Sequence, residues 1–139
     1  MVGTWSPDQV RLVTLDGSGA TVLVRDDVRG FDVKDVVDQK VGVVDDLVID
    51  EAADRVRLLK VGYGGILGFG REHRLVPVDI VESVAGRSVF LGARKAVVES
   101  APVGEDIAGE FFMTELYEHY GHEPYWSNGY REPDWNRPE

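Results

Sequence analysis

The chain is 139 residues long, 43% of its residues are hydrophobic, and its formal net charge at pH 7 is −10. This length is enough for one domain with extensions, and the chain lacks the run of about 18 apolar residues that a transmembrane helix needs. The absence of cysteine excludes disulfides and thiolate chemistry and, with an N-terminus unlike a signal peptide, favours a cytoplasmic protein. The acidic charge disfavours direct binding to nucleic acid or to anionic lipid.

The elements predicted along the chain are mostly short strands. Residues 1–27 are a lead-in, in which residues 20–24 are rich in β-forming side chains and are expected to pair with a sheet edge. Residues 28–92 alternate short apolar runs with turn residues, which predicts an all-β domain of about six strands, a small and mostly antiparallel barrel. The expected strands are residues 28–36, 41–50, 55–63, 73–78, 83–84 and 88–91.

A group of carboxylates lies in the second expected strand and in the turn that follows it. Asp45 has the same parity as the apolar residues of that strand, so we expect a β-bulge or an exposed position there, because burying an unpaired charge is costly. The group lacks the glycine of a calcium loop and offers no two carboxylates in different environments for acid–base catalysis. We interpret the group as an exposed acidic rim, made of Asp45, Asp46, Asp50, Glu51 and Asp54.

Residues 64–70 form a glycine-rich run with four glycines in seven positions. Glycine permits positive φ, so the chain can reverse sharply here, and we expect Ile66, Leu67 and Phe69 to lie beneath the sheet. A phosphate-binding loop would lead into a helix and carry a lysine, whereas a strand follows this run. That strand contains Pro77, which lacks an N–H and therefore belongs at a sheet edge or a bulge.

Several short motifs in residues 28–92 together carry a family resemblance. They are Arg29-Gly30, Val33, Val41-Gly42, Asp45-Asp46-Leu47, Ile49-Asp50, Gly64-Gly65, Leu67-Gly68, Gly70 and Leu75-Val76-Pro77-Val78-Asp79. As a set they resemble the PRC-barrel family, which includes the cytoplasmic part of photosynthetic reaction-centre H subunits and the C-terminal domain of ribosome-maturation factors. The resemblance implies a small barrel that acts as an adaptor or ligand-docking module, and it implies no shared catalytic residue.

Residues 93–139 are expected to form a helical and aromatic extension. A short helix over residues 93–100 ends at an Ala-Pro-Val-Gly sequence, and a second over residues 107–120 has an apolar face and Gly121 as its C-cap. Residues 105–139 are strongly acidic, with 9 acids and 2 bases. Of the 13 aromatic residues in the chain, 8 lie in this extension: Phe111, Phe112, Tyr117, Tyr120, Tyr125, Trp126, Tyr130 and Trp135.

Such an aromatic density is unusual for a disordered tail, so these residues are expected to pack on this domain, a second copy or another protein. Tyrosine and tryptophan are enriched in binding hot spots because they bury a large area with few rotatable bonds. We therefore take the eight aromatic residues as the candidate interaction surface. A homodimer is the most economical arrangement, because exposed aromatic surface of this size promotes association.

The three histidines are the remaining candidates for chemistry. Glu115 and His119 have helical spacing, and with His122 they offer nitrogen and carboxylate ligands of the kind that zinc accepts. His73 lies between a glutamate and an arginine, where it could be an ordinary ion-paired residue or relay protons. Because such groupings are common by chance, we predict no metal, cofactor or catalytic residue.

The sequence thus favours a non-catalytic protein-interaction or adaptor module that associates with itself through its aromatic tail. Two alternatives stay open. One is an assembly or regulatory factor for a ribosomal or membrane electron-transfer complex, which would contact a basic protein rather than RNA. The other is a small-ligand-binding barrel that uses His73 and the acidic rim, and a deep pocket with shifted pKa values would favour it.

Overall fold

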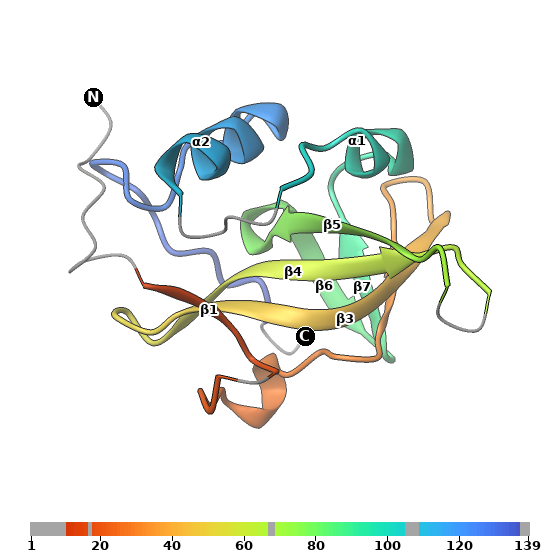
Figure 1. Cartoon of the computed structure of the whole chain (residues 1–139), viewed down its shortest axis with the longest axis horizontal. Coiled ribbons are helices and arrows are strands. Elements are labelled where there is room, and N and C mark those ends of the chain that lie inside the picture. Colours follow the sequence, from red (N-terminus) through yellow and green to blue (C-terminus); the bar gives the residue numbers. More distant parts are fainter. Residues whose placement is uncertain (1–10, 17, 67–68, 105–108, 137–139) are drawn as a thin grey trace.

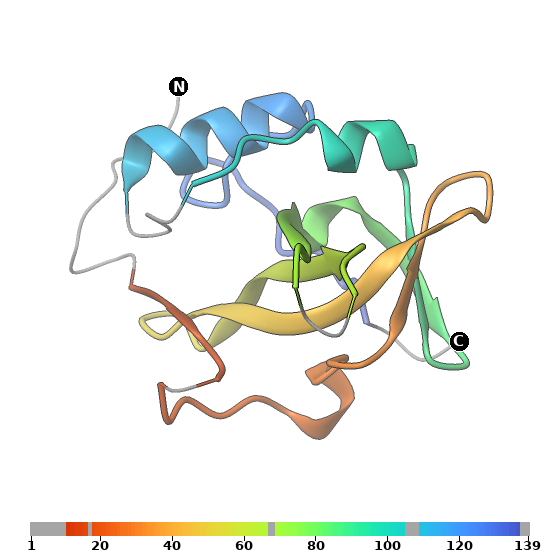
Figure 2. The ribbon, with the colours of Figure 1, turned by 45° about the vertical axis from the view of Figure 1, so that its right-hand side comes forward.

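The computed structural model describes residues 11–16, 18–66, 69–104 and 109–136. These residues form one curved sheet of seven strands, with two short helices lying over one side of it (Figures 1 and 2). The strands are β1 (Leu12–Thr14), β2 (Asp32–Lys34), β3 (Lys40–Asp50), β4 (Arg55–Tyr63), β5 (Glu72–Pro77), β6 (Val81–Ala85) and β7 (Ser88–Leu91). The helices are α1 (Lys95–Glu99) and α2 (Glu110–His119), and the 3-10 turns are η1 (Val24–Asp26) and η2 (Val78–Ile80).

The sheet is mixed and open. Its strand order is β5-β4-β3-β2-β7-β6, while β1 pairs with β3, and the only parallel pair between the described strands is β2 with β7. The predicted β-rich fold with a helical extension is confirmed. Closure of the sheet into a barrel is not confirmed, because no backbone pairing joins β5 to β6 in the described part of the chain. Pro77 ends the edge strand β5, and η2 follows it directly, which redirects the chain before β6.

The predicted strands agree with the structure best where the apolar pattern is longest. The strands expected over residues 41–50, 55–63 and 88–91 correspond to β3, β4 and β7 to within one residue. The first expected strand is reduced to β2, because a turn with Gly30 at a φ of 87° takes up its start. Residues 20–24 form no strand, and the lead-in contributes β1 instead.

Two register shifts decide which side chains of β3 and β4 enter the core. One falls between Val44 and Asp46 and leaves Asp45 outside the ladder, which confirms the predicted bulge. The other pairs Val48 with Leu58 and Ile49 with Val56, so Arg57 is the extra residue on β4. As a result, Val56 and Leu58 belong to different hydrophobic clusters, although simple alternation places them on one face.

The sheet has a hydrophobic cluster on each side. The first fills its curved interior, and the second lies between β3, β4 and α2, whose Met113, Leu116 and Tyr117 are fully buried. Helix α2 ends as predicted at Gly121, which has a φ of 68°. The Gly121 and His122 N–H groups donate to the carbonyls of Glu118 and Tyr117, and this closes the last turn. The predicted start of this helix, residues 107–108, lies outside the described residues.

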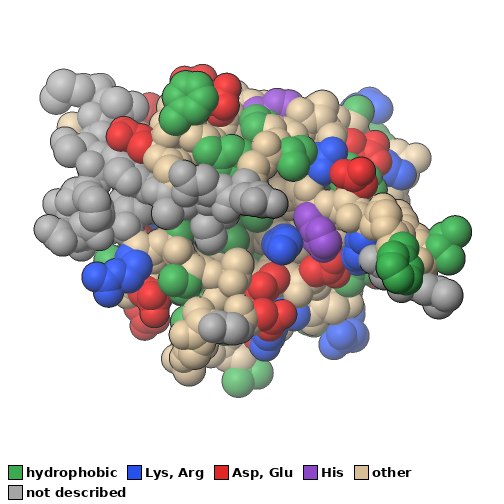
Figure 3. All heavy atoms as spheres, in the orientation of Figure 1, with side chains coloured by type: hydrophobic (Ala, Val, Ile, Leu, Met, Phe, Trp, Pro, Cys, Tyr) green, Lys and Arg blue, Asp and Glu red, His purple; other side chains and the backbone are tan. Residues whose placement is uncertain are grey.

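The glycine-rich turn differs from its prediction. Ile66 and Phe69 pair with each other at the end of the β4–β5 hairpin and are 78% and 83% exposed, so they do not lie beneath the sheet. The hairpin projects past the other described strands, and hydrophobic side chains stand at the surface at this end of the molecule (Figures 1 and 3). Leu67 lies outside the described residues. No helix in the ranges that the structure describes is long and apolar enough to cross a membrane.

Candidate functional site at the tail–sheet seam

The tail, residues 120–136, contains no helix or strand and crosses the sheet to reach the lead-in. Its far end is held there, since Trp135 packs on the first cluster and Asn136 donates to the Asp26 carboxylate. Of the eight predicted interaction residues, all but Phe111 are buried or half-buried against this chain's own clusters. The exception is Phe111 on α2, which is 79% exposed. The aromatic residues therefore anchor the tail to its own sheet.

The centre of this contact, called the seam below, is an aromatic cluster around Tyr117. Its ring lies 6.1 Å from that of Tyr125, 5.9 Å from that of Trp126 and 6.4 Å from that of His122, measured between centroids. The contacts with Tyr125 and Trp126 are edge-to-face, the geometry that aromatic quadrupoles prefer. The turn at Gly121 makes these contacts possible, because it reverses the chain and returns it to the C-terminal end of α2.

Arg57 is the main charged residue of the seam. The bulge on β4 turns its side chain toward the tail, where it is only 5% exposed. Its Nη1 donates to both oxygens of Glu132 at 2.9 Å, and its Nε lies 3.9 Å from the Asp50 carboxylate. The guanidinium also lies over the Tyr125 ring, 4.3 Å from its centroid. One arginine thereby joins a strand to two points of the tail.

Asp79 provides the second polar attachment. Its side chain is 2% exposed, it accepts a hydrogen bond from the Tyr130 hydroxyl, and it lies 4.0 Å from Nε2 of His122. Burial raises the pKa of Asp79, while the Tyr130 hydrogen bond, His122 and Arg57 oppose the rise. Burial and this same carboxylate raise the pKa of Tyr130, which keeps its hydroxyl a donor. The seam thus joins residues from β4, η2 and the tail.

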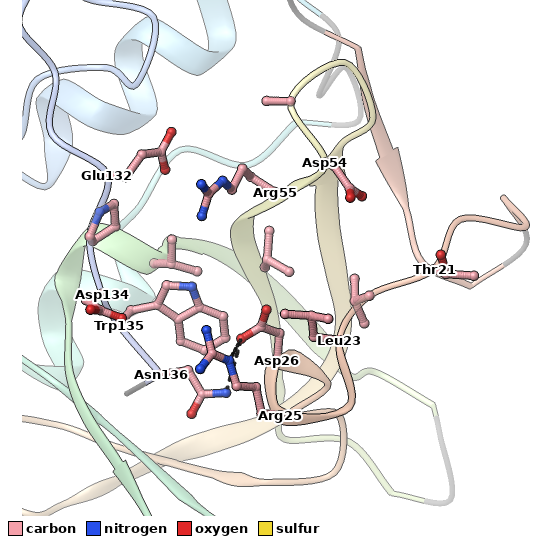
Figure 4. Close-up of a pocket in the computed structure, with 15 residues that line it drawn as sticks. Thr21, Leu23, Arg25, Asp26, Asp54, Arg55, Glu132, Asp134, Trp135 and Asn136 are labelled. Atoms are coloured by element: carbon pink, nitrogen blue, oxygen red, sulfur yellow. Dashed lines mark hydrogen bonds and ion pairs between the residues drawn. The ribbon is translucent and has the colours of Figure 1, made fainter. Parts of the chain in front are cut away.

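A pocket of about 470 Å³ opens beside the seam, between the lead-in, the β3–β4 turn and the end of the tail. Trp135, Arg25 and Asn136 lie together near Asp26, and Arg55 extends from the other side toward the tail (Figure 4). The charged residues of its lining are of both signs: Arg25, Arg55, Asp26, Asp54, Glu132 and Asp134. This mixture selects neither an anionic nor a cationic ligand.

The prediction of an exposed acidic rim is wrong for two of its five carboxylates. Asp46 and Asp50 are buried, and hydrogen bonds from backbone N–H groups compensate their carboxylates for the lost solvation. Asp46 binds the N–H groups of Leu47 and Asp16, and Asp50 binds those of Arg11 and Ala52. Glu51 and Asp54 are exposed as expected, so the five carboxylates do not form one surface.

Asp45, at the bulge of β3, forms a separate polar group with two residues of the β5 end of the sheet. It accepts bonds from Arg71 Nε and Nη2 at 2.8 and 2.9 Å, and His73 Nε2 lies 2.8 Å from the same carboxylate. The Arg71 hydrogen bond, with a contribution from His73, lowers the pKa of Asp45. Gly62 leaves the space for this group, since a Cβ there would lie 2.0 Å from the carboxylate.

Asp45→Asn is expected to destabilise the protein at pH 7 and to matter progressively less in acid. The carboxylate has a pKa below its ordinary value of 3.8 in the folded state, so its contribution is present above that value and is lost as the pH falls through the folded-state pKa. Urea unfolding between about pH 3 and pH 7 measures this. Asp54→Asn, on an exposed residue without a described ion pair, is the control. If the unfolding free energies of Asp45→Asn and wild type differ by the same amount at every pH, the ionised Asp45 carboxylate does not stabilise the fold as proposed.

The residues weighed as a metal site are not brought together. His119 Nε2 lies 2.7 Å from the Val97 carbonyl, and His122 faces Asp79 on one side and the Glu123 carbonyl on the other. Glu115 is exposed on α2. The described ranges contain no group of three or more histidine and acidic residues that could hold a metal ion.

Sequence reasoning missed Arg57 and Asp79 as seam residues. One signal for Arg57 was available, because it is a lone charge inside the apolar stretch Val56 to Leu59. Asp79 lies within the motifs that carry the family resemblance, although its tail partners are 43 and 51 residues away in sequence. No local pattern indicates those partners.

The comparison with known proteins covers most residues of the sheet and not those of the tail. The model of the PRC-barrel domain matches residues 21–95, which is more than half of the chain and contains β2 to β7. A search of curated proteins finds no match. Because the family match covers more than half of the chain, the chain belongs to the PRC-barrel domain family.

Proposed function

We propose that this protein is a non-catalytic protein-interaction module, in which sheet and tail form one scaffold and the outer face of α2 binds the partner. The proposal rests on Phe111. Among the eight aromatic residues of the C-terminal extension, it is the one that the fold leaves at the surface, at 79% exposure. It shares a helix face with Glu115 and Glu118, which follow it by four and seven residues. An exposed aromatic side chain at the centre of a polar rim is the common arrangement of a binding hot spot.

The charge of this face indicates a basic partner. Glu110, Glu115 and Glu118 are exposed, and none forms an ion pair with another described residue. Complementary charge speeds association and suppresses wrong partners. A basic protein surface with an apolar recess for Phe111 therefore fits better than a second acidic copy. The same charge is compatible with the alternative of an assembly factor that contacts a basic protein of a ribosome.

Self-association through the tail has less support from the contacts. Seven of the eight aromatic residues are already packed within the chain, so they offer little free surface to a second copy. The small-ligand alternative has the pocket of about 470 Å³, which is within the usual size range of ligand sites. However, its Glu132 is engaged by Arg57 and its Asp26 by Asn136, so part of its polar lining is already used.

Binding to a labelled peptide of alternating lysine and leucine tests the proposal. We expect binding that weakens with salt, as electrostatic attraction does. We expect Phe111→Ser to weaken this binding about thirtyfold, which corresponds to a hot-spot loss of about 2 kcal/mol. Ile66→Ser is the matched control, because Ile66 is similarly exposed at 78% but lies on the hairpin. Equal binding by wild type and Phe111→Ser contradicts the proposal. A dimer in light scattering that Phe111→Ser dissociates would identify a second copy as the partner instead.

A further inference from the structure

Four buried side-chain polar atoms belong to residues of the seam, and none has a hydrogen-bond partner among the described residues. They are Arg57 Nε, Asp79 Oδ1, Tyr117 Oη and Tyr125 Oη. Their side chains form one cluster. The rings of Tyr117 and Tyr125 are 6.1 Å apart, and the Arg57 guanidinium is 4.3 Å from the Tyr125 ring. Asp79 joins the cluster through Tyr130, whose ring is 6.5 Å from that of Tyr125.

Four such atoms within one contact between elements are unusual for a folded protein. The large majority of buried side-chain polar atoms in native structures are hydrogen-bonded, to protein or to ordered water. A buried polar atom without a partner costs more than an ordinary hydrogen bond contributes, because it has lost its solvation and gained nothing. Globular proteins hold roughly one buried water per 27 residues, so about five are expected in 139 residues.

The chemistry of the four atoms suits water. Arg57 Nε is a donor, Asp79 Oδ1 is an acceptor, and each tyrosine hydroxyl can do both. A water molecule donates two hydrogen bonds and accepts two, so it can connect all three kinds of group. A metal cation fits poorly, because the Arg57 guanidinium would repel it and neutral phenols are weak ligands.

We propose that Arg57, Asp79, Tyr117 and Tyr125 form a binding site for ordered water, in which one or two molecules join α2 and the tail to the sheet. Three of the four atoms belong to β4, η2 and α2 and the fourth to the tail, so bridging water would connect the tail to these elements. The site goes beyond the proposed interaction face, since it lies on the other side of α2 and concerns how the tail is held.

The sign of a stability change tests this site. If water is bound, Tyr117→Phe and Tyr125→Phe each remove a satisfied hydroxyl, and we expect the equilibrium constant for unfolding to rise about three- to tenfold. If no water is bound, the same changes remove a buried hydroxyl that has no hydrogen-bond partner. The equilibrium constant for unfolding is then unchanged or lower, and this result overturns the proposal. Because both tyrosines share the water, we expect the double variant to lose less unfolding free energy than the sum of the two single variants.

Two further tyrosines calibrate the measurement. Tyr120→Phe removes a direct bond to the Leu75 carbonyl and is expected to raise the unfolding constant whatever the seam contains. Tyr63→Phe, on a half-exposed residue at the end of β4, is expected to change it little. A crystal structure of the full chain at about 1.5 Å resolution gives the second readout. Water within about 3.2 Å of at least two of the four atoms supports the site, and an unhydrated cluster overturns it.

Discussion

Arg57→Ala is expected to lower the free energy of unfolding by about 3 kcal/mol, because removing one partner of a buried ion pair leaves the other uncompensated. The side chains of Arg57 and Asp50 are 5% and 2% exposed. Asp50 keeps its backbone donors but loses its nearby cation, and Glu132 loses both of its bonds. The cation–π contact with Tyr125 is lost as well. The tail should therefore detach more easily from the sheet.

Urea unfolding measures the loss, and the rate of proteolysis within residues 120–136 reports whether the tail is released. Arg55→Ala is a matched control, because Arg55 lies two residues earlier on the same strand but is exposed and makes no ion pair with a described residue. It is expected to change stability by less than about 0.5 kcal/mol. Similar effects of the two substitutions would show that Arg57 does not hold the tail.

Gly42→Ala is expected to destabilise the protein by about 3 kcal/mol or more. Gly42 is buried on β3, between β2 and β4, and an added Cβ would lie 2.3 Å from the backbone carbonyl oxygen of Gly62 and 3.1 Å from Val61 Cγ1. Overpacking against side chains typically costs about 1–3 kcal/mol. A clash with a strand backbone exceeds that range, because relieving it means separating two paired strands at the centre of the sheet.

Thermal and urea unfolding of Gly42→Ala and Gly92→Ala separate this steric effect from the general cost of replacing glycine. At Gly92 the nearest atom to an added Cβ is Glu82 Cγ at 3.2 Å, part of a flexible and exposed side chain that can move away. We expect little loss there. If both variants unfold at the same denaturant concentration, close contact between β3 and β4 at Gly42 is not what the fold requires.

The two sites have different consequences for function. Gly42 lies within the family domain, so its substitution tests the scaffold itself. Arg57 also lies in that domain, but most of its contacts are with the tail, outside residues 21–95. A variant that releases the tail without unfolding the sheet would show whether partner binding by the α2 face needs the tail in place.

Local pattern was sufficient for the longer strands and for the end of α2. Apolar alternation and turn residues predicted β3, β4 and β7 closely, and a positive-φ glycine predicted the end of α2 at Gly121. The cost of burying a charge predicted the bulge at Asp45, and the missing N–H of Pro77 predicted its place on an edge strand. Each of these follows from the conformational or bonding properties of a residue and its close neighbours.

Only the tertiary structure decided where the polar and aromatic side chains lie. Asp46 and Asp50 are buried because backbone N–H groups from the lead-in, more than 25 residues away, reach them. Ile66 and Phe69 are exposed because the hairpin projects past the other described strands, and the tail aromatics are buried or half-buried because the chain returns to its own sheet. Sequence pattern by itself determined β3, β4, β7 and the C-terminal end of α2, since those depend on short-range periodicity and turn residues, and the motifs of residues 28–92 indicated the family. Partners distant in sequence depend on how the elements are assembled, and periodicity carries no information about that.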